Sequence, residues 1–284
     1  MTKSLVEFVR PRTATFLSVT FCVALAPTDL TARQAAAGPP ADAPQAEDAD
    51  WRSYGRDLAE QRYSPLGQIM RENVSRLSVA WTYDIPRRGA RLEATPLMAD
   101  GVMYATGPMS TVFALDARTG EELWYWDPAI PEEEQGGPSV CCGDVNRGLG
   151  MHGDRIFVGL LDGRLVALNR HDGRVEWSVQ TTPAGQDYTI TGAPRVFRDR
   201  VVIGNAGAEY GVRGYVTAYA VDDGEQLWRT YTVPGNPADG FESEAMRVAA
   251  ETWTGEWWHI GGGGTVWDAM AYDGEHDLLY IGTG

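Results

Sequence analysis

From Trp51 to the end of the chain, short runs of alternating apolar and polar residues are separated by polar turns that contain glycine. Alternation with a period of two is typical of β-strands that are buried on one face. One pattern occurs three times, as ALDARTGEELW (residues 114–124), ALNRHDGRVEW (167–177) and AYAVDDGEQLW (218–228). Each copy predicts a strand, a turn with glycine at a position of positive φ, and a second strand that ends on tryptophan.

The repeat period indicates a propeller. The repeated tryptophans, at positions 124, 177 and 228, are 53 and 51 residues apart, a period typical of propellers and related arrays. With the hairpin that precedes each copy, such as GVMYATG before TVFALD, each period holds four short strands, enough for one blade. We expect each repeated tryptophan to pack between neighbouring blades, its ring against the next turn. No helix of useful length is predicted, apart from a short one near residues 57–61.

The number of repeats bears on the completeness of the fold. Three or four blades of this size do not close a ring, and closure is what removes exposed sheet edges from a propeller. The last seven residues, LLYIGTG, form a predicted strand at which the sequence stops. We therefore expect these residues to be the first part of a longer chain.

The composition is that of a folded protein that does not bind polyanions. Of its 284 residues 43% are hydrophobic, and the formal net charge of −15 argues against binding to nucleic acid or anionic membranes. Three basic residues precede an apolar run at 15–26 that is too short to span a bilayer, so we expect a signal peptide over residues 1–37 and a periplasmic location. Loss of its four basic and two acidic groups changes the net charge from −15 to −17. An uncleaved anchor is the alternative, and residues 38–50 are expected to form a solvated linker.

Cys141 and Cys142 are adjacent in the motif VCCGDVNRG, and the third cysteine, Cys22, lies in the predicted signal peptide. In an oxidising compartment the pair can join to each other or to another chain. A trans peptide holds neighbouring Cα atoms about 3.8 Å apart, below the ~4.4–6.8 Å that disulfides prefer, so a bond between them would close a strained ring. Such strain concentrates at functional sites. The other interpretation is two reduced, buried cysteines that pack as small hydrophobic residues.

Five motifs, in order along the chain, carry a family resemblance: DWRSYGRDLAEQRYSPL, LEATPLMADGVMYATGP, VCCGDVNRG, YTITGAPRVFRDRVVIGNAGAEYGVRGYVTAY and GGGGTVWDAMAYD. With the repeats, they make the chain resemble the periplasmic quinoprotein alcohol dehydrogenases, which use pyrroloquinoline quinone (PQQ) and calcium inside an eight-bladed propeller. The resemblance implies an all-β fold in which residues 51–284 form the N-terminal portion, about half, of such a propeller. The tryptophan repeats alone are less specific, because non-catalytic propellers share them.

The resemblance also implies a cofactor pocket. Cys141 and Cys142 would form a disulfide that covers one face of PQQ, and Trp267 would stack on the opposite face. Arg147 would lie near the quinone oxygens, where a charge-assisted hydrogen bond favours negative charge. Contacts to the carboxylates and the rim of the cofactor are implied for Glu93, Thr191, Ala206, Gly207, Ala208 and Thr265. Without the resemblance, lone threonines in strands are usually structural, and Trp267 would be an ordinary tryptophan between blades.

The metal and the reaction follow from the same resemblance. Glu209, in GAEYG, matches a carboxylate ligand of calcium, an ion that prefers hard oxygen ligands; a lanthanide in its place is left open. The family's asparagine ligand and aspartate base would lie beyond Gly284, so we expect the fragment to be inactive alone. In the complete family a primary alcohol becomes an aldehyde by hydride transfer to PQQ. Electrons then pass to a cytochrome c, in some members through a haem c domain, which here would also lie beyond Gly284.

Two alternatives stay open at this point. One is a non-catalytic PQQ-like propeller that acts as a binding or assembly scaffold, although such a protein has no reason to combine Cys-Cys, GAEYG and Thr-x-Trp. The other is a PQQ dehydrogenase for sugars or polyols, because several side chains that select the substrate are expected beyond this sequence. The sequence does not determine membrane attachment.

Overall fold

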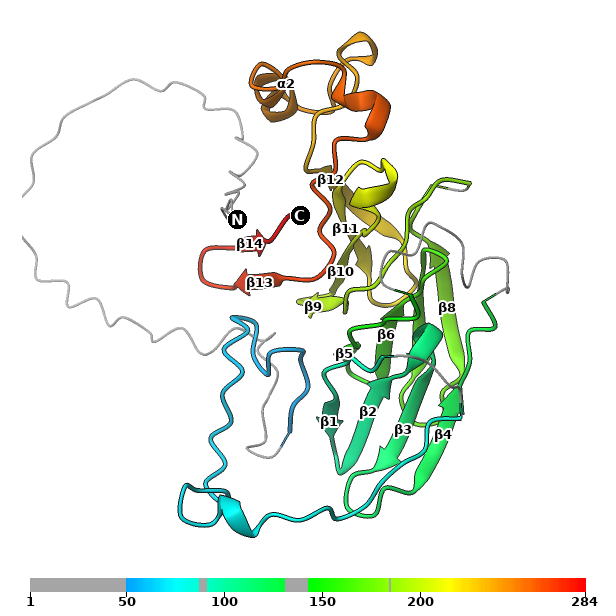
Figure 1. Cartoon of the computed structure of the whole chain (residues 1–284), viewed down its shortest axis with the longest axis vertical. Coiled ribbons are helices and arrows are strands. Elements are labelled where there is room, and N and C mark those ends of the chain that lie inside the picture. The colour runs from blue at the N-terminus through cyan, green and yellow to red at the C-terminus, as the bar shows by residue number, and fades with distance from the viewer. Residues whose placement is uncertain (1–49, 87–90, 131–142, 184) are drawn as a thin grey trace, which may run out of the picture.

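The computed structural model describes residues 50–86, 91–130, 143–183 and 185–284, which form antiparallel sheets (Figure 1). The first three sheets have four strands each: β1 (Leu97–Ala99), β2 (Val102–Thr106), β3 (Val112–Asp116) and β4 (Glu122–Trp126); β5 (Gly150–His152), β6 (Arg155–Gly159), β7 (Arg164–Asn169) and β8 (Val175–Gln180); β9 (Arg195–Phe197), β10 (Arg200–Gly204), β11 (Tyr215–Ala220) and β12 (Gln226–Tyr231). A fourth sheet pairs β13 (Met270–Asp273) with β14 (Leu278–Ile281). Consecutive strands are neighbours in each sheet, so the prediction of an all-β chain with four strands per repeat is confirmed.

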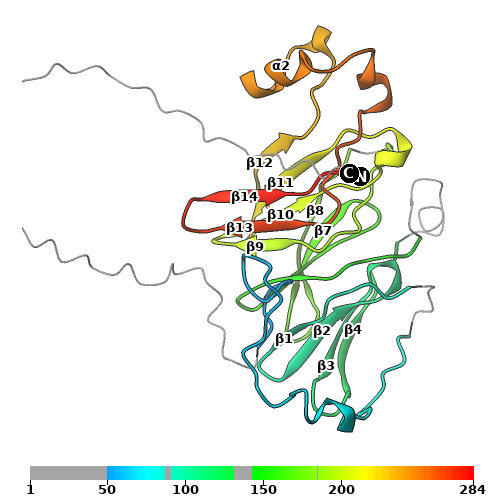
Figure 2. The same ribbon diagram turned by 60° about the vertical axis from the view of Figure 1, so that its left-hand side comes forward.

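Burial explains which strands keep the alternating pattern. The middle strands, such as β6 and β7, are buried along almost their whole length, because both faces of each sheet are covered. The fourth strands are half exposed, and β8 alternates between exposed and partly buried residues. The hydrophobic core is therefore a series of layers between successive sheets, and one layer contains Phe157, Leu165, Ile203 and Tyr219. Figures 1 and 2 both place the β13–β14 hairpin beside β9.

A tryptophan docks on the glycine turn of a neighbouring sheet, as the repeat predicts for Trp124 and Trp177, whereas Trp228 packs against the layer that contains Phe197 and Tyr272. The indole Nε1–H donates to a backbone carbonyl of that turn in the pairs Trp81–Ala117 (3.2 Å), Trp124–Arg170 (2.9 Å) and Trp177–Val221 (3.1 Å). The glycine under each ring has positive φ, and a Cβ would lie 2.6 Å (Gly120), 2.7 Å (Gly173) or 2.8 Å (Gly224) from the indole. Trp81, which precedes β1 and lies in no described strand, docks in the same way and was not part of the repeated sequence pattern.

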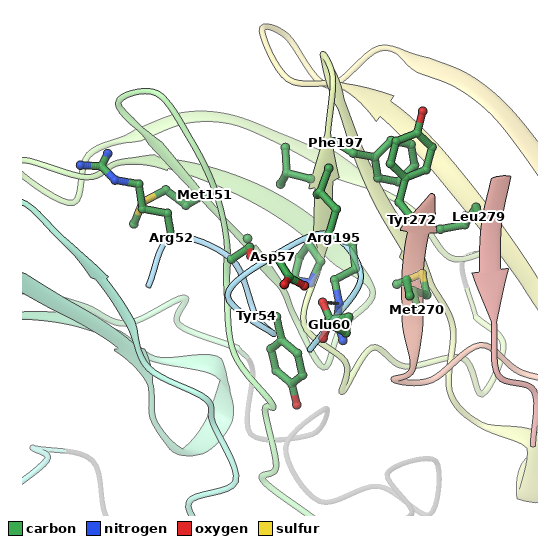
Figure 3. A pocket seen from close by; sticks show the side chains of 16 residues that line it. Arg52, Tyr54, Asp57, Glu60, Met151, Arg195, Phe197, Met270, Tyr272 and Leu279 are labelled. Carbon is green, nitrogen blue, oxygen red and sulfur yellow. Dashed lines mark hydrogen bonds and ion pairs between the residues drawn. The ribbon is translucent and has the colours of Figure 1, made fainter. Parts of the chain in front are cut away.

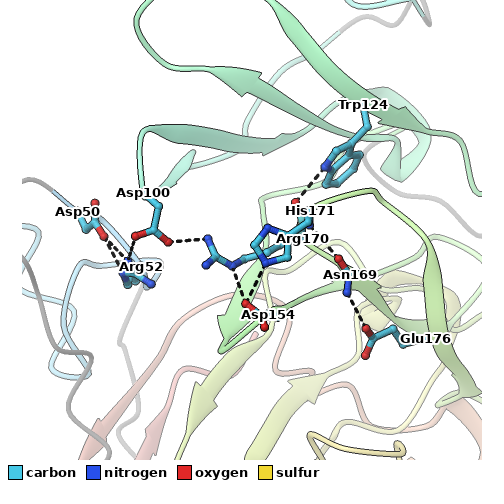
Figure 4. Close-up of polar contacts among 9 residues, drawn as sticks. All are labelled: Asp50, Arg52, Asp100, Trp124, Asp154, Asn169, Arg170, His171 and Glu176. Atoms are coloured by element: carbon cyan, nitrogen blue, oxygen red, sulfur yellow. Dashed lines mark hydrogen bonds and ion pairs between the residues drawn. The ribbon is translucent and has the colours of Figure 1, made fainter.

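Charged side chains join the turns of the first two sheets to the start of the described chain (Figure 4). Asp100, in the β1–β2 turn, accepts from Arg52 at 2.9 Å and lies 2.8 Å from Arg170 Nη1. Asp154, in the β5–β6 turn, lies 3.0 Å from His171 and 3.5 Å from Arg170. The hydrogen bond from Arg170 is the main reason that the pKa of the Asp100 carboxyl is lowered.

The prediction about helices was wrong in its position. Residues 57–61 form turns, and an α-helix, α2 (Glu244–Ala250), lies instead in the connection between β12 and β13. Ser243 caps this helix, because its hydroxyl accepts a hydrogen bond from the N–H of Met246 at 3.2 Å. In Figures 1 and 2 this connection projects beyond the sheets. No helix in the described residues is long and apolar enough to cross a membrane.

Two predictions of domain structure fall largely outside the described residues. These are the signal peptide at residues 1–37 and all of the linker except Asp50. Asp50 itself is buried and lies 2.6 Å from Arg52. Arg52 also pairs with Asp100 in the β1–β2 turn, so the last residue of the expected linker is connected to the first sheet through Arg52.

The tryptophan docking predicts a large effect of a single methyl group. Gly173→Ala should lower the free energy of unfolding through the cost of positive φ, about 1–2 kcal/mol, and through overpacking against Trp124, about 1–3 kcal/mol. Gly153 also has positive φ but nothing within 4 Å of its Cβ position, so Gly153→Ala should lose only the first contribution. Denaturant unfolding of both variants measures the difference, and equal losses would contradict the docking.

Asp100 predicts a pH-dependent contribution to stability. Its folded-state pKa lies below the ordinary value of 3.8, so its stabilising effect is complete above 3.8 and is lost as the pH falls through the lower, folded pKa. Asp100→Asn should therefore be less stable than the wild type at neutral pH, and the difference should shrink in strongly acidic solution. Unfolding curves across the pH range test this; a difference that does not depend on pH would refute it.

Candidate functional site

Arg147 lies at the centre of the residues that the sequence assigned to the cofactor. Its guanidinium is 3.3 Å from Glu93, and its Cζ lies 4.8 Å from the ring centre of Trp267. The carbonyl of Thr191 accepts from the Arg147 backbone N–H at 3.0 Å and from its guanidinium at 3.4 Å. The structure thus brings together four predicted residues that are spread over more than half of the sequence.

The repeat of the fold explains why these four residues meet. Glu93, Arg147, Thr191 and Trp267 each lie shortly before the first strand of a different sheet, namely β1, β5, β9 and β13. We call these stretches the lead-in segments, residues 93–96, 146–149, 191–194 and 265–269. Because the first strands lie at equivalent positions in successive sheets, their lead-in segments lie at the same end of the structure.

Backbone contacts hold neighbouring lead-in segments together. The N–H of Thr95 donates to the carbonyl of Arg147 at 3.2 Å, and Thr95 forms a parallel bridge with Gly148. Gly192 permits the next contact, because a Cβ there would lie 2.3 Å from the carbonyl oxygen of Trp267. The segments therefore form a continuous series, and each depends on the one beside it.

Asn146 anchors the segment that carries Arg147, a role that was not predicted from the sequence. This buried side chain donates to the carbonyl of Gly159 at 2.7 Å and to the hydroxyl of Ser110 at 3.1 Å. Its Oδ1 accepts from the N–H of Gly148 at 2.9 Å. Asn146 lies inside the motif VCCGDVNRG, directly before Arg147. This position in the motif is the sequence feature from which its role could have been predicted.

The remaining predicted cofactor residues lie on the third sheet and before the fourth. Thr191 and Thr265 are buried. Thr265 is fixed through its backbone, which exchanges two hydrogen bonds with Gly284 at 3.0 and 3.1 Å. Ala206, Gly207 and Ala208 follow β10, and the N–H of Ala206 donates to the carbonyl of Thr189 at 2.8 Å.

Glu209 lies on a 3-10 turn, Ala208–Tyr210, between two glycines in the left-handed conformation. Its side chain is exposed and forms no ion pair within the described residues. The preceding residue approaches the glycine stretch that leads to Thr265, because the Ala208 Cβ is 3.8 Å from the position of a Cβ on Gly263. The parts of the chain that the structure describes contain no cluster of three or more acidic, histidine or cysteine side chains that could hold a metal.

The described residues fit a planar, anionic cofactor. Trp267 is 42% exposed, so a large aromatic face is accessible beside the guanidinium of Arg147. The hydroxyls of the two buried threonines, Thr191 and Thr265, can donate to carboxylate oxygens, and Glu209 offers a hard oxygen ligand to a metal. Cys141 and Cys142 lie outside the described residues, so their predicted disulfide stays a prediction.

A cavity of about 440 Å³ lies beside Trp267 and the β13–β14 hairpin. Asp268 lines it, and in the described residues the buried Oδ1 of this side chain has no hydrogen-bond partner. Glu60 and Arg195 reach the same cavity from the start of the chain and from β9. None of these three residues was predicted from the sequence to belong to the site.

Comparison with known proteins identifies the family. The PQQ family described as "Glucose/ethanol/alcohol dehydrogenase, beta-propeller domain" matches residues 51–284. The chain belongs to the PQQ-dependent alcohol dehydrogenase family. The fold of three four-stranded sheets and a further hairpin is therefore part of this family's propeller.

Relatives within this family are longer than the chain. It is 54% identical over 237 residues to the quinohemoprotein alcohol dehydrogenase ADH IIB of Pseudomonas putida, which covers 83% of this chain and 34% of the relative. It is 49% identical over 208 residues to the "1-butanol dehydrogenase (cytochrome c)" of Thauera butanivorans, which covers 72% of this chain and 29% of that protein. The chain spans about a third of the length of these curated relatives.

Solved structures of the family agree with the fold. The structure of the quinohemoprotein alcohol dehydrogenase ADHIIG of Pseudomonas putida matches with a TM-score of 0.79 and 51% identity, over 84% of this chain and 35% of that one. A europium-containing methanol dehydrogenase matches with a TM-score of 0.73 and 33% identity, over 84% of this chain and 42% of that one.

The contacts of Asn146 predict its contribution to stability. Asn146→Ala would leave buried groups without partners, and each such group costs about 1–3 kcal/mol, so the free energy of unfolding should fall by about 2–4 kcal/mol. Asn236 is partly exposed and accepts one hydrogen bond, from Ala238, so Asn236→Ala should cost about 1 kcal/mol or less. Chemical denaturation compares the two variants, and a cost at Asn146 as small as at Asn236 would show that the anchor is unimportant.

Proposed function

We propose that this chain is the cofactor-binding part of a periplasmic quinoprotein that oxidises a primary alcohol to an aldehyde and passes the electrons to a cytochrome c. Membership of the PQQ-dependent alcohol dehydrogenase family supports the class of reaction. The name of the Thauera butanivorans relative, which joins 1-butanol oxidation to cytochrome c, supports the substrate class and the acceptor. A haem c domain elsewhere in the protein is part of the proposal, in view of the quinohemoprotein relatives.

The convergence of Glu93, Arg147, Thr191 and Trp267 at the lead-in segments carries this proposal. An exposed indole and a largely buried guanidinium side by side suit a flat, conjugated anion. A scaffold protein has no need for an exposed tryptophan, Trp267, beside the guanidinium of Arg147. It also has no need for the ion-pair partner of that guanidinium, Glu93, to be partly exposed. The site chemistry therefore favours a dehydrogenase over the scaffold alternative.

Each side chain has a defined task in the proposed mechanism. When bound, PQQ supplies a quinone that accepts hydride, and the metal ion supplies Lewis acidity. Arg147 would donate charge-assisted hydrogen bonds to a quinone oxygen and so favour negative charge there. Trp267 would fix the plane of the ring, and the hydroxyls of Thr191 and Thr265 would hold carboxylates at its rim.

Glu93 and Glu209 would divide the acidic roles. Glu93 is 3.3 Å from Arg147, so it would keep the guanidinium oriented toward the cofactor. Glu209 would coordinate the metal, which we propose to be calcium; a lanthanide is the competing metal, given the europium-containing relative. We assign no residue of this chain as the general base that takes the alcohol's proton, and we propose that residues 51–284 alone bind PQQ without turnover.

The periplasmic location rests on the sequence of the first 37 residues. Three basic residues followed by an apolar run at 15–26 are typical of a signal peptide. A periplasmic site also provides the oxidising conditions in which Cys141 and Cys142 would form the proposed disulfide over the cofactor. We therefore propose that residues 1–37 are removed on export.

A reconstitution experiment tests the proposed function. The full-length native protein would be purified from the periplasm, loaded with PQQ and Ca²⁺, and assayed for dye reduction with ethanol, 1-butanol and glucose. Glu209→Ala should lower metal-dependent turnover about 100-fold or more, because a Lewis acid contributes several kcal/mol to the transition state. Turnover of the alcohols but not of glucose would support an alcohol dehydrogenase over the sugar alternative.

A second glutamate provides the control for this variant. Glu225 is exposed in the turn between β11 and β12, and Glu225→Ala should leave turnover unchanged. Well-folded wild-type protein that neither binds PQQ nor reduces the dye would reject the dehydrogenase and favour the scaffold. Equal loss in both variants would remove the metal role from Glu209.

A further inference from the structure

Residues 50–62, here named the crossing segment, pass along the first strands of several sheets. Figure 1 shows them in blue beside β5, β9 and β13. Their contacts are two backbone hydrogen bonds between Trp51 and Met98 of β1 (2.8 and 2.9 Å), one from the N–H of Tyr272 in β13 to the carbonyl of Leu58 (2.8 Å), and an ion pair of Glu60 with Arg195 of β9 (2.9 Å). The crossing segment thus ties together sheets that are distant in sequence.

Arg195 is the hub of these contacts (Figure 3). Its Nε donates to Glu60 Oε1 at 2.9 Å, and its Cζ lies 3.9 Å from the ring centre of Tyr54. Its remaining contact is a hydrogen bond from Nη1 to the carbonyl of Ala193 at 2.7 Å. The buried guanidinium of Arg195 thus contacts Glu60, Tyr54 and the Ala193 carbonyl. A planar guanidinium has several N–H donors in fixed directions, so it can make such contacts simultaneously.

The Glu60 carboxyl depends on this guanidinium. Burial raises the pKa of Glu60 above its ordinary value, although the charges of Arg195 and Arg62 act in the opposite direction. Loss of Arg195 would therefore leave this largely buried carboxyl with only weaker compensation, from Arg62 at 3.7 Å and from a backbone hydrogen bond of Gly55. Breaking such a pair from one side is strongly destabilising to its local geometry.

The backbone of the crossing segment is held in an unfavourable conformation. Arg56, Glu60 and Arg62 have φ values of 73°, 58° and 57°, in the left-handed region that residues with side chains rarely adopt. Strained backbone of this kind persists only where the surrounding contacts determine it, and it is enriched at functional sites. Two such contacts are the ion pair of Glu60 with Arg195 and the stacking of Arg62 on Tyr54, at 4.8 Å from the ring centre.

Two contacts connect this cluster to the cofactor residues. Ala193, which Arg195 holds by its carbonyl, follows Thr191 by two residues, and the Thr191 carbonyl accepts both hydrogen bonds from Arg147. On the other side, the Tyr54 ring lies 3.6 Å from the position of a Cβ on Gly148, the residue after Arg147. The cluster therefore supports both segments between which Arg147 is held.

We propose that Arg195, fixed by Glu60 and Tyr54, is a positioning residue that sets the Thr191–Ala193 backbone and thereby aims Arg147 at PQQ. In this role it acts through the backbone of that segment, and no direct contact with the cofactor or the substrate is assigned to it. This inference rests on the proposed function, because it assigns the aim of Arg147 toward that cofactor. The crossing segment is then a support for the cofactor site as well as a part of the fold.

The test compares two arginines of the same chemistry in the full-length native protein. Arg195→Gln should raise the Kd for PQQ about 10- to 100-fold, the usual effect of losing an outer support of a ligand site. Arg229, on β12, also stacks on a tyrosine (4.0 Å from the Tyr215 ring) and donates to a backbone carbonyl, but contacts no lead-in segment. Arg229→Gln should leave the Kd within about twofold of the wild type.

A conservative variant separates positioning from a loss of folding. Arg195→Lys keeps the charge opposite Glu60 but not the planar fork, so its Kd should lie between those of the wild type and Arg195→Gln. It also replaces Arg195→Gln if that variant does not fold. An unchanged Kd in the folded variants, or an equal rise in Arg229→Gln, would overturn the proposal.

Hydrogen exchange without cofactor gives a readout that does not depend on the proposed function. The N–H of Arg147, which donates to Thr191, should exchange faster in Arg195→Gln and at the wild-type rate in Arg229→Gln. Unchanged exchange at Arg147 would overturn the positioning role. If the wild-type protein binds no PQQ but exchange at Arg147 is still faster in Arg195→Gln, the structural link between Arg195 and Arg147 holds. The proposal that this link serves cofactor binding is then rejected.

Discussion

The docking of one sheet's tryptophan on the next sheet's glycine turn is the constraint on which the structure depends. The indole needs a turn without a side chain beneath it and a carbonyl within reach of its Nε1–H, and the three pairs from Trp81 to Val221 satisfy both. The dockings of Trp124 and Trp177 each relate one described sheet to the next. The apolar layers between sheets then fill the space that the docking defines.

Placement of the site follows from this repetition. Sheets that are stacked in the same way bring the residues before their first strands to one end, and there Arg147 meets Glu93, Thr191 and Trp267. None of these contacts lies within a sheet. The site therefore belongs to the relation between sheets, and its geometry is as precise as the packing of the layers beneath it.

Buried polar groups refine that geometry. Asn146 anchors the Arg147 segment from one side, and Arg195 with Tyr54 supports it from the other. A buried polar group that loses its hydrogen-bond partner raises the free energy of the structure. Positions of the segment that would break these hydrogen bonds are therefore unfavourable. An electrostatic site needs such rigidity, because a guanidinium stabilises developing charge only when it is already in place.

The sequence by itself determined the repeat, the strand order within each sheet and the turn glycines, because these depend on local periodicity and on the φ values that glycine permits. It also determined the family through motifs such as VCCGDVNRG and GGGGTVWDAMAYD, and with it the residues expected around the cofactor. The helix at Glu244–Ala250 was missed, since seven residues with one buried member, Met246, give almost no periodic signal.

Only the tertiary structure decided which distant residues support the site. Glu60 and Arg195 are 135 residues apart and lie in no repeated pattern, so nothing local marks them as partners. The link from Asn146 to Gly159 and the buried Asp268 Oδ1 are likewise products of chain segments that meet after folding. The local sequence pattern determines the strands and turns. Pairs of buried polar groups form only when the packing of distant segments buries both partners at the same place.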